Sequence, residues 1–298
     1  MKINEHYDNS QISTYQQCPF SYYLQYIKGI RKIFIDDSNA SMNFGSYVHK
    51  FLEAHFKNSK CSFNDIIKDY EEPEDLPQYS IDSLKLFCRT YLEKYQIKDK
   101  EFEVKEVEKN SVCDLGKYKF IVKKDGVIKY NDNIFGLENK TTKSISYNYF
   151  DKYFINSQID AQCFTTYQDY NQCSGILLNV GEIKFLKRKP TGNYDSFKQV
   201  EDGWIAIKFN RDFVNRNKQE LYQWKANTLM WIDKIEESKK NNNWARSTGL
   251  WGGTICSKCQ YKELCKVSVG MELDESILNV LYEVVDPYEY LKGEKNGI

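Results

Sequence analysis

Residues 125–140 read Asp125-Gly-Val-Ile-Lys-Tyr-Asn-Asp-Asn-Ile-Phe-Gly-Leu-Glu138-Asn-Lys140 and predict two short strands joined by a tight turn. Alternate residues of a strand point to the same face, so Glu138 and Lys140 project together. A hairpin through residues 130–133 brings Asp125, at the start of the first strand, alongside them. Two carboxylates on neighbouring strands form an oxygen-rich site suited to Mg²⁺ or Mn²⁺, and the lysine can stabilise charge on a phosphate under attack.

The Glu-x-Lys triplet alone is a weak signal, because the chain contains three more. These are Glu103-Val-Lys105, Glu182-Ile-Lys184 and Glu237-Ser-Lys239. Only Glu138 follows a strand that begins with an Asp, with a turn between them. Before any other motif is considered, a solvated surface triplet remains an equal alternative to a metal site.

Around this hairpin, periodicity predicts blocks of helices and strands. We expect a helix over about 13–27, opened by a capping box at Ser13 and interrupted at Pro19, and further helices over 44–56 and 80–95. Strands at 102–108, 117–123, 126–130 and 133–140 precede a helix over 154–170, strands near 175–185 and 204–209, and a long helix over 212–239. This order suggests an α/β fold with a mixed sheet flanked by helices, and the absence of repeats and linkers favours one domain over residues 1–298.

Three cysteines lie within ten residues near the C-terminus, at Cys256, Cys259 and Cys265. A Cys-x-x-Cys turn lets two sulfurs converge on one metal centre, and a third thiol leaves one vacancy in a Cys₄ set. Cys18, beside the helix-interrupting Pro19, is the expected fourth ligand, because the other cysteines lie in predicted elements or their connections. The spacing fits zinc as well as an iron-sulfur cluster, and either group would join the two ends of the chain.

Composition narrows the classes of function. The 298 residues carry a formal net charge of zero, so any nucleic-acid contact must be local. No segment approaches the roughly 18 apolar residues of a membrane helix, and the N-terminus lacks a secretory signal, so we expect a cytoplasmic protein with no membrane partner. The sequence contains no phosphate-loop motif, which argues against ATP hydrolysis.

A histidine lies on the second predicted helix, in Phe44-Gly-Ser-Tyr-Val-His49. A lone histidine on an amphipathic helix is more often structural than functional. Gly45, one turn earlier, weakens that interpretation, because a glycine there permits close approach of a strand or a substrate.

Together these motifs resemble the RecB-type branch of the PD-(D/E)xK nuclease superfamily, and specifically its iron-sulfur members: AddB-type recombination nucleases, CRISPR-adaptation exonucleases and their phage relatives. The matching segments are, in the family's order, Ile12-Ser-Thr-Tyr-Gln-Gln-Cys18-Pro-Phe-Ser-Tyr-Tyr, the Gly-x-x-x-His helix ending at His49, Asp125 with Glu138-x-Lys140, and the cluster Cys256, Cys259 and Cys265. Two places depart from the pattern. Val122-Lys-Lys precedes Asp125 where a glycine is frequent, and on the following helix Gln158 is paired with Gln162 where a tyrosine is usual.

The resemblance implies a restriction-endonuclease-like central mixed sheet flanked by helices, with a catalytic core over residues 100–185. It implies that residues 1–30 and 250–270 form an iron-sulfur region, in which a [4Fe-4S] cluster on Cys18, Cys256, Cys259 and Cys265 joins the terminal segments. It further implies that Mg²⁺ or Mn²⁺ binds His49, Asp125, Glu138 and the backbone carbonyl of Asn139. Lys140 would be the catalytic lysine, and Gln158 and Gln162 would contact DNA.

The implied function is a metal-dependent deoxyribonuclease, an exonuclease in DNA recombination, repair or replication, with a helicase or recombination protein as a partner. One alternative is a DNA-binding or scaffold subunit that keeps the fold and the cluster but does not cut. Zero net charge and the residue Gln162 favour that alternative, whereas the intact His49, Asp125, Glu138 and Lys140 argue against it. A zinc-ribbon protein with unrelated chemistry is the third hypothesis.

Overall fold

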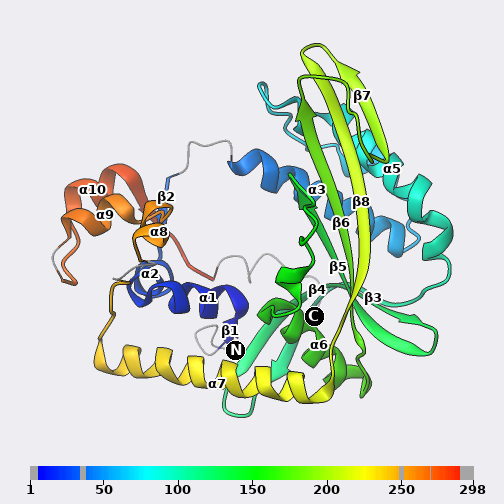
Figure 1. Ribbon diagram of the computed structural model, residues 1–298. Coiled ribbons are helices and arrows are strands. Elements are labelled where there is room, and N and C mark those ends of the chain that lie inside the picture. The colour runs from blue at the N-terminus through cyan, green and yellow to red at the C-terminus, as the bar shows by residue number, and fades with distance from the viewer. Residues whose placement is uncertain (1–5, 34–37, 248–251, 269, 289–298) are drawn as a thin grey trace. The chain divides into compact units, whose positions relative to one another are not determined.

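The structure, a computed structural model, describes residues 6–33, 38–247, 252–268 and 270–288 (Figure 1). The chain divides into a larger unit, residues 36–113 and 122–224, and a smaller unit, residues 1–35, 114–121 and 225–298. Of the predicted iron-sulfur region, residues 1–5, 250, 251 and 269 lie outside the described residues. The assignment of one nuclease domain to residues 1–298 stays a prediction.

The larger unit is built on a mixed sheet, which confirms the predicted α/β class. Its strands are β3 (Glu103–Asp114), β4 (Lys119–Tyr130), β5 (Asn133–Thr142), β6 (Gly175–Leu186), β7 (Ser196–Val200) and β8 (Gly203–Asn215). They lie in the order β3-β4-β5-β6-β8-β7. Strand β5 pairs with β6 in parallel, whereas the pairs β4–β5, β6–β8 and β7–β8 are antiparallel.

The predicted hairpin is the one between β4 and β5. Its loop consists of Asn131 and Asp132, whose φ angles of 47° and 61° are both left-handed, the conformation that a two-residue turn requires and that Asn and Asp tolerate. The prediction of two separate strands at 117–123 and 126–130 is wrong, because β4 is continuous and Asp125 lies within it. Gly126 is not a break but a point of close approach, since a Cβ there would lie 3.0 Å from the carbonyl oxygen of Glu106.

Helices cover both faces of this sheet. They are α3 (Ser38–Phe56), α5 (Ile81–Asp99) and α6 (Ser157–Tyr170), with a short α4 (Phe63–Ile66) and single 3₁₀ turns at Pro77–Tyr79 and Asp151–Tyr153. Phe44 of α3 and Phe87 of α5 belong to the same buried cluster as Leu137 of β5. The next residue, Glu138, points the other way and bonds to α6. Alternation along β5 therefore puts an apolar core on one face and the polar residues Glu138 and Lys140 on the other.

Two further expectations are corrected in this unit. Strand β7 was not expected, and its five residues pair with the start of β8. Residues 212–215 end β8 rather than begin a helix, since Asp212 pairs with Leu178 and Asn215 with Gly175. The long helix α7 (Lys218–Asn241) starts only after this strand. Because Arg211 and Asp212 are polar, the sequence does not indicate a strand at this position. Pairing with β6 makes the strand favourable.

The smaller unit contains both terminal parts of the chain. Its elements are β1 (His6–Asp8), α1 (Asn9–Gln17), α2 (Pro19–Tyr22), a π-helix η2 (Tyr23–Ile27), β2 (Ile30–Lys32), α8 (Gly252–Ser257), α9 (Lys262–Val267), α10 (Glu275–Leu281) and β9 (Tyr282–Val284). Strand β2 pairs with β9 in antiparallel fashion, so sequence-distant segments meet in one small sheet. Strand β1 pairs in parallel with residues 119–121 of β4.

The first helix starts earlier than expected. Asp8, not Ser13, is its N-cap, and the Asp8 carboxylate accepts the backbone N–H of Gln11 at 2.7 Å. The predicted interruption is confirmed, because Cys18 is extended (φ −163°) and Pro19 opens the next helix. Cys18 therefore sits at a helix junction.

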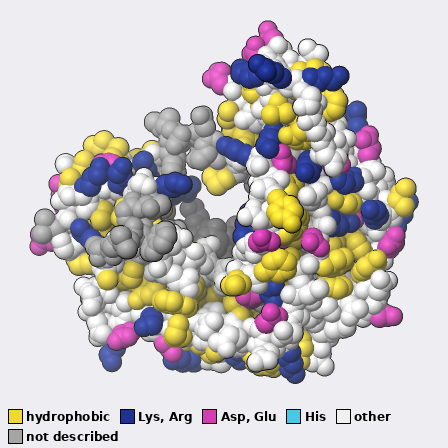
Figure 2. All heavy atoms as spheres, in the orientation of Figure 1, with side chains coloured by type: hydrophobic (Ala, Val, Ile, Leu, Met, Phe, Trp, Pro, Cys, Tyr) yellow, Lys and Arg dark blue, Asp and Glu magenta, His cyan; other side chains and the backbone are white. Residues whose placement is uncertain are grey.

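None of the described helices is both long and apolar enough to cross a membrane. On the face that Figure 2 shows, Lys and Arg side chains are interspersed with Asp and Glu, in keeping with the net charge of zero. Contacts with an anionic partner must therefore be local.

Candidate active site

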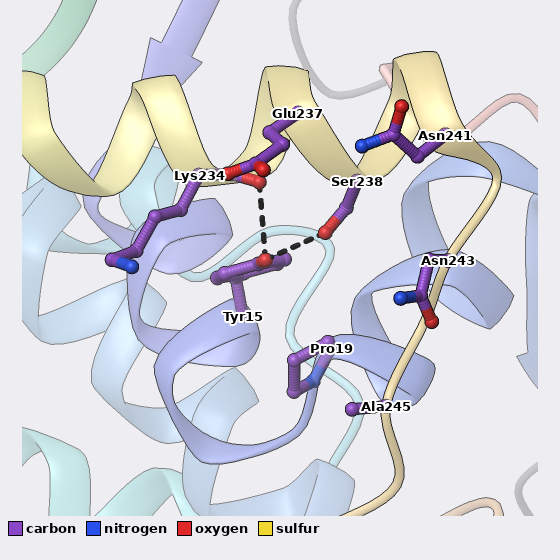
Figure 3. Close-up of a pocket in the computed structure, with 8 residues that line it drawn as sticks. All are labelled: Tyr15, Pro19, Lys234, Glu237, Ser238, Asn241, Asn243 and Ala245. Carbon is purple, nitrogen blue, oxygen red and sulfur yellow. Dashed lines mark hydrogen bonds between the residues drawn. The ribbon is translucent and has the colours of Figure 1, made fainter.

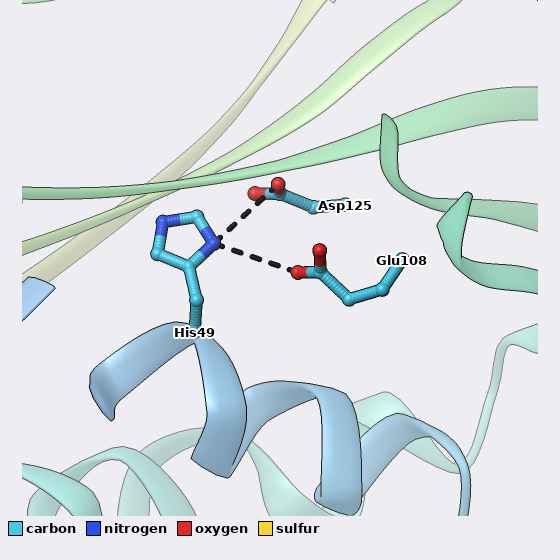
Figure 4. Close-up of side chains that lie close together, drawn as sticks. All are labelled: His49, Glu108 and Asp125. Atoms are coloured by element: carbon cyan, nitrogen blue, oxygen red, sulfur yellow. Dashed lines mark ion pairs between the residues drawn. The ribbon is translucent and has the colours of Figure 1, made fainter. Parts of the chain in front are cut away.

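Three residues with metal-ligating side chains converge from separate elements of the larger unit (Figure 4): His49 of α3, Glu108 of β3 and Asp125 of β4. His49 Nδ1 lies 3.6 Å from Glu108 Oε1 and 3.4 Å from Asp125 Oδ1. Within the described ranges, no other His, Cys, Asp and Glu side chains bring three ligand atoms within 4.8 Å of one another. An imidazole and two carboxylates suit Mn²⁺ or Mg²⁺.

The protonation of His49 indicates that this site favours a positive charge. Burial alone would lower the pKa of His49, but hydrogen bonds to Asp125 and Glu108 outweigh it and raise the pKa to about 10. The imidazole is therefore protonated at neutral pH and places a positive charge between two carboxylates. A divalent cation bound there would supply that charge instead and release the proton.

Helix α3 can bring His49 this close because of Gly45. A Cβ on Gly45 would lie 3.2 Å from the Thr141 hydroxyl of β5, a tighter contact than side chains normally make. Gly45 thus allows α3 to approach β5 closely, as the sequence suggested. It favours a functional position for His49.

Glu108 was missed by the sequence analysis. It ends the expected strand 102–108, and its spacing from Glu106 does not reveal which of the two carboxylates turns toward the site. In the structure Glu106 pairs with Lys109 and Lys124. Glu108 has a φ of 47°, which is uncommon for a residue other than glycine and which interrupts the regular course of β3.

Asp125 is held where the pairing of β4 with β5 ends. The last paired residues are Gly126 and Leu137, and Asp125 and Glu138 come next on the two strands. Asp125 Oδ2 accepts the backbone N–H of Asn139 at 2.7 Å, which leaves Oδ1 toward His49. The Asn139 side chain accepts a hydrogen bond from Asn179 Nδ2 at 2.9 Å. The role of the Asn139 carbonyl as a metal ligand stays a prediction.

Glu138 and Lys140 lie together on the face toward α6, as the strand geometry predicts, and their charged groups are in contact. Burial and the charge of Asp125 raise the pKa of Glu138, and the Lys140 ammonium opposes that rise. Burial would lower the pKa of Lys140, but the Glu138 carboxylate prevails and raises it. Lys140 is therefore an ammonium at neutral pH, suited to donate hydrogen bonds and not to accept a proton.

Gln158 and Gln162, predicted to contact DNA, both bond to Glu138. Gln158 Nε2 donates to Oε1 at 3.0 Å and Gln162 Nε2 to Oε2 at 2.6 Å. Gln162 is only 1% exposed. In this structure the two amides hold the Glu138 carboxylate, and their contact with DNA stays a prediction.

The four predicted cluster cysteines all belong to the smaller unit, and the structure brings them together. The Ser247 N–H donates to Cys18 Sγ at 3.4 Å, and Cys256 Sγ lies 3.9 Å from the Ser247 carbonyl oxygen. Burial raises the pKa of Cys259, and so do the nearby thiols of the other three cysteines. Burial likewise raises the pKa of Cys265.

A groove of about 280 Å³ lies near Cys18 in the same unit (Figure 3). Its lining includes Lys234, Glu237 and Ser238 of α7. The Tyr15 hydroxyl donates a hydrogen bond to the Lys234 carbonyl oxygen (3.1 Å) and forms another with the Ser238 hydroxyl (2.7 Å). Because the Lys234 ammonium and the Glu237 carboxylate both line the groove, its charges do not favour either an anionic or a cationic ligand.

The sequence matches the family model of the PD-(D/E)XK nuclease superfamily over residues 9–266. The chain belongs to this superfamily. The match covers His49, Glu108, Asp125, Glu138 and Lys140 together with Cys18, Cys256, Cys259 and Cys265. Enzymes of this superfamily are nucleases that use divalent metals, which fits the ligand set in the larger unit.

Comparisons with curated proteins and with solved structures give less information about this chain. No curated protein matches the sequence. A crystal structure similar to this nuclease is that of a protein from Eubacterium rectale described as a candidate exonuclease. The two are 13% identical with a TM-score of 0.48, and the match covers 93% of each chain.

Proposed function

We propose that this chain is a metal-dependent deoxyribonuclease that cleaves phosphodiester bonds with His49, Glu108, Asp125, Glu138 and Lys140. The observation that carries the proposal is the convergence of His49, Glu108 and Asp125 beside the Glu138–Lys140 pair. Such a gathering of carboxylates around one half-buried histidine is costly unless a cation neutralises their charge.

His49, Glu108 and Asp125 would hold the divalent ion, with Glu138 beside them. When bound, the ion supplies Lewis acidity toward the oxygens of the scissile phosphate. Asp125 keeps its orientation through the Asn139 N–H, and Glu138 keeps its own through Gln158 and Gln162. These hydrogen bonds fix the carboxylates before substrate arrives, so little reorganisation is needed during the reaction.

Lys140 is more accessible to substrate than its partner Glu138. Its side chain is 28% exposed, against 2% for Glu138. The ammonium can therefore donate to a phosphate oxygen or orient the attacking water while Glu138 remains in place. A contact of this kind that strengthens in the transition state contributes on the order of 10²-fold to the rate.

A [4Fe-4S] cluster on Cys18, Cys256, Cys259 and Cys265 is part of the proposal. Four thiols gathered in one place repel one another when ionised, and a metal group removes that repulsion. A single zinc ion would need sulfurs about 3.8 Å apart, given zinc–sulfur bonds of about 2.3 Å in a tetrahedron. The choice of a [4Fe-4S] cluster over a single zinc ion rests on the resemblance of the ordered cysteine motif to the iron-sulfur members of the superfamily.

Our proposal also includes exonuclease action in DNA recombination, repair or replication, membership of the RecB-type branch, and a helicase or recombination partner. These three assignments rest on the ordered motifs. A cytoplasmic location is proposed from the sequence, in which neither a membrane helix nor a secretory signal was found. The alternative is a subunit that binds DNA without cutting it. The complete catalytic set, including a protonated Lys140, favours the enzyme.

The test is incubation of anaerobically purified protein with end-labelled single- and double-stranded DNA, with and without Mn²⁺. We expect cleavage only with Mn²⁺, and none by Asp125→Ala. Binding of DNA with Mn²⁺ but without cleavage would favour the scaffold alternative. Cleavage by Asp125→Ala at the parent rate would place the active site elsewhere.

A further inference from the structure

The connection between β5 and α6, residues 143–156, adjoins the candidate active site at both ends. It reads Lys143-Ser-Ile-Ser-Tyr-Asn-Tyr-Phe-Asp-Lys-Tyr-Phe-Ile-Asn156. It starts three residues after Lys140 and ends two residues before Gln158. Both ends of the connection therefore lie close to the Glu138–Lys140 pair.

Two buried tyrosines anchor this connection. The hydroxyls of Tyr149 and Tyr153 lie 3.5 Å apart, and both side chains are buried. Tyr149 contributes to the raised pKa of Lys140. Burial raises the pKa of Tyr153, with a smaller contribution from Glu138. Both hydroxyls therefore lie within electrostatic range of the catalytic pair.

Three other apolar side chains of the connection point into solvent. Tyr147, two residues from the anchor Tyr149, is fully exposed. Phe154 and Ile155, next to the anchor Tyr153, are 58% and 95% exposed. Within residues 147–155, the rings of Tyr149 and Tyr153 are thus buried, whereas Tyr147, Phe154 and Ile155 are exposed. Exposed apolar side chains gathered next to an active site mark a candidate binding surface.

The charges of the connection favour an anionic partner. Lys143 and Lys152 are exposed, and neither forms an ion pair within the part of the chain that is described. The Lys152 ammonium lies 3.8 Å from the centre of the Tyr149 ring. One carboxylate, Asp151, opposes the two ammonium groups. Apolar rings interleaved with lysines are the pattern that single-stranded nucleic acid binds.

We propose that the connection is a stacking surface for single-stranded DNA, on which unpaired bases next to the scissile phosphate stack against Tyr147 and Phe154 and pack on Ile155. Lys143 and Lys152 contact the neighbouring phosphates. Bases of a duplex are already stacked and paired, so they gain little from these rings. The inference rests on the proposed function and adds to it a preference for single strands.

The experiment measures binding of a fluorescein-labelled oligothymidylate and of a blunt hairpin duplex in excess EDTA. The variants are Tyr147→Ala, Phe154→Ala and the double variant. Ile97→Ala on α5 is the matched control, since Ile97 is 81% exposed and lies outside the site. We expect each aromatic loss to weaken single-strand binding about tenfold. Tyr147→Trp should retain it, and duplex binding and Ile97→Ala should stay at the parent level.

The proposal is overturned if the double variant binds the oligothymidylate within about twofold of the parent, or if duplex binding falls equally. Self-association of the parent that the double variant loses, with DNA affinity unchanged, would assign the surface to a protein contact instead. Failure of the parent to bind either DNA would count against the proposed function itself. Parent-level cleavage and binding by the double variant would overturn only the stacking surface.

Discussion

The backbone N–H of Asn139 donates a hydrogen bond to the carboxylate of Asp125 across 2.7 Å. This bond forms next to the last backbone pair of β4 and β5, Gly126 with Leu137. The Asp125 side chain thus hydrogen-bonds β4 to β5 just beyond the point where the backbone pairing of the two strands ends. The bond also orients the second carboxylate oxygen toward His49.

The first prediction separates the structural role of Asp125 from its charge. Asp125→Asn keeps an acceptor for the Asn139 N–H, whereas Asp125→Ala leaves that buried donor unpaired at a cost of roughly 1–3 kcal/mol in the free energy of unfolding. Both variants should lose Mn²⁺-dependent cleavage. Urea unfolding should show that Asp125→Asn is more stable than Asp125→Ala. Equal stability would mean that the hydrogen bond from the Asn139 N–H does not stabilise the fold.

A second prediction concerns the pH dependence of metal binding. His49 is protonated below its pKa of about 10 in the metal-free protein, and a histidine must lose this proton before it can bind a metal ion. Mn²⁺ affinity should therefore rise with pH between 6 and 9, by up to about tenfold per unit if one proton is released. Calorimetry across this range measures it. His49→Ala should bind Mn²⁺ more weakly and with a flatter pH profile, and an unchanged slope would exclude His49 as the group that titrates.

The third prediction addresses Gln162. Gln162→Leu removes a hydrogen bond from the buried Glu138 carboxylate, so its pKa should rise further and cleavage should fall. Because Gln162 is buried, DNA affinity in EDTA should stay at the parent value. A loss of DNA affinity with cleavage per bound molecule intact would instead support the direct DNA contact expected from the motif.

The fourth prediction concerns the cysteine cluster. Protein purified without oxygen should be brown and contain about four irons per chain. Cys259→Ser should lose iron and melt at a lower temperature, because the group joins segments more than 200 residues apart. Cys61→Ser, at an exposed cysteine outside the cluster, is the control and should change neither property. Stoichiometric zinc without iron in the parent would overturn the iron-sulfur assignment.

The sequence could predict those parts of the site that depend on local pattern. The alternation of Leu137, Glu138 and Lys140 set their faces, and the Asn131–Asp132 turn set the hairpin. Glu108 could not be predicted, because its approach to His49 depends on a left-handed residue inside β3 and on a helix some 60 residues earlier. The strand character of residues 212–215 likewise arises only from pairing with β6.

The most direct test of the metal-dependent nuclease is Lys140→Ala beside Lys105→Ala, the lysine of another Glu-x-Lys triplet, whose ammonium pairs with Glu103 at an exposed site. Cleavage of end-labelled DNA and Mn²⁺ binding are measured for both variants. Lys140→Ala should keep Mn²⁺ and DNA binding but cleave roughly 10²-fold more slowly, while Lys105→Ala matches the parent. Parent-level cleavage by Lys140→Ala would contradict the account.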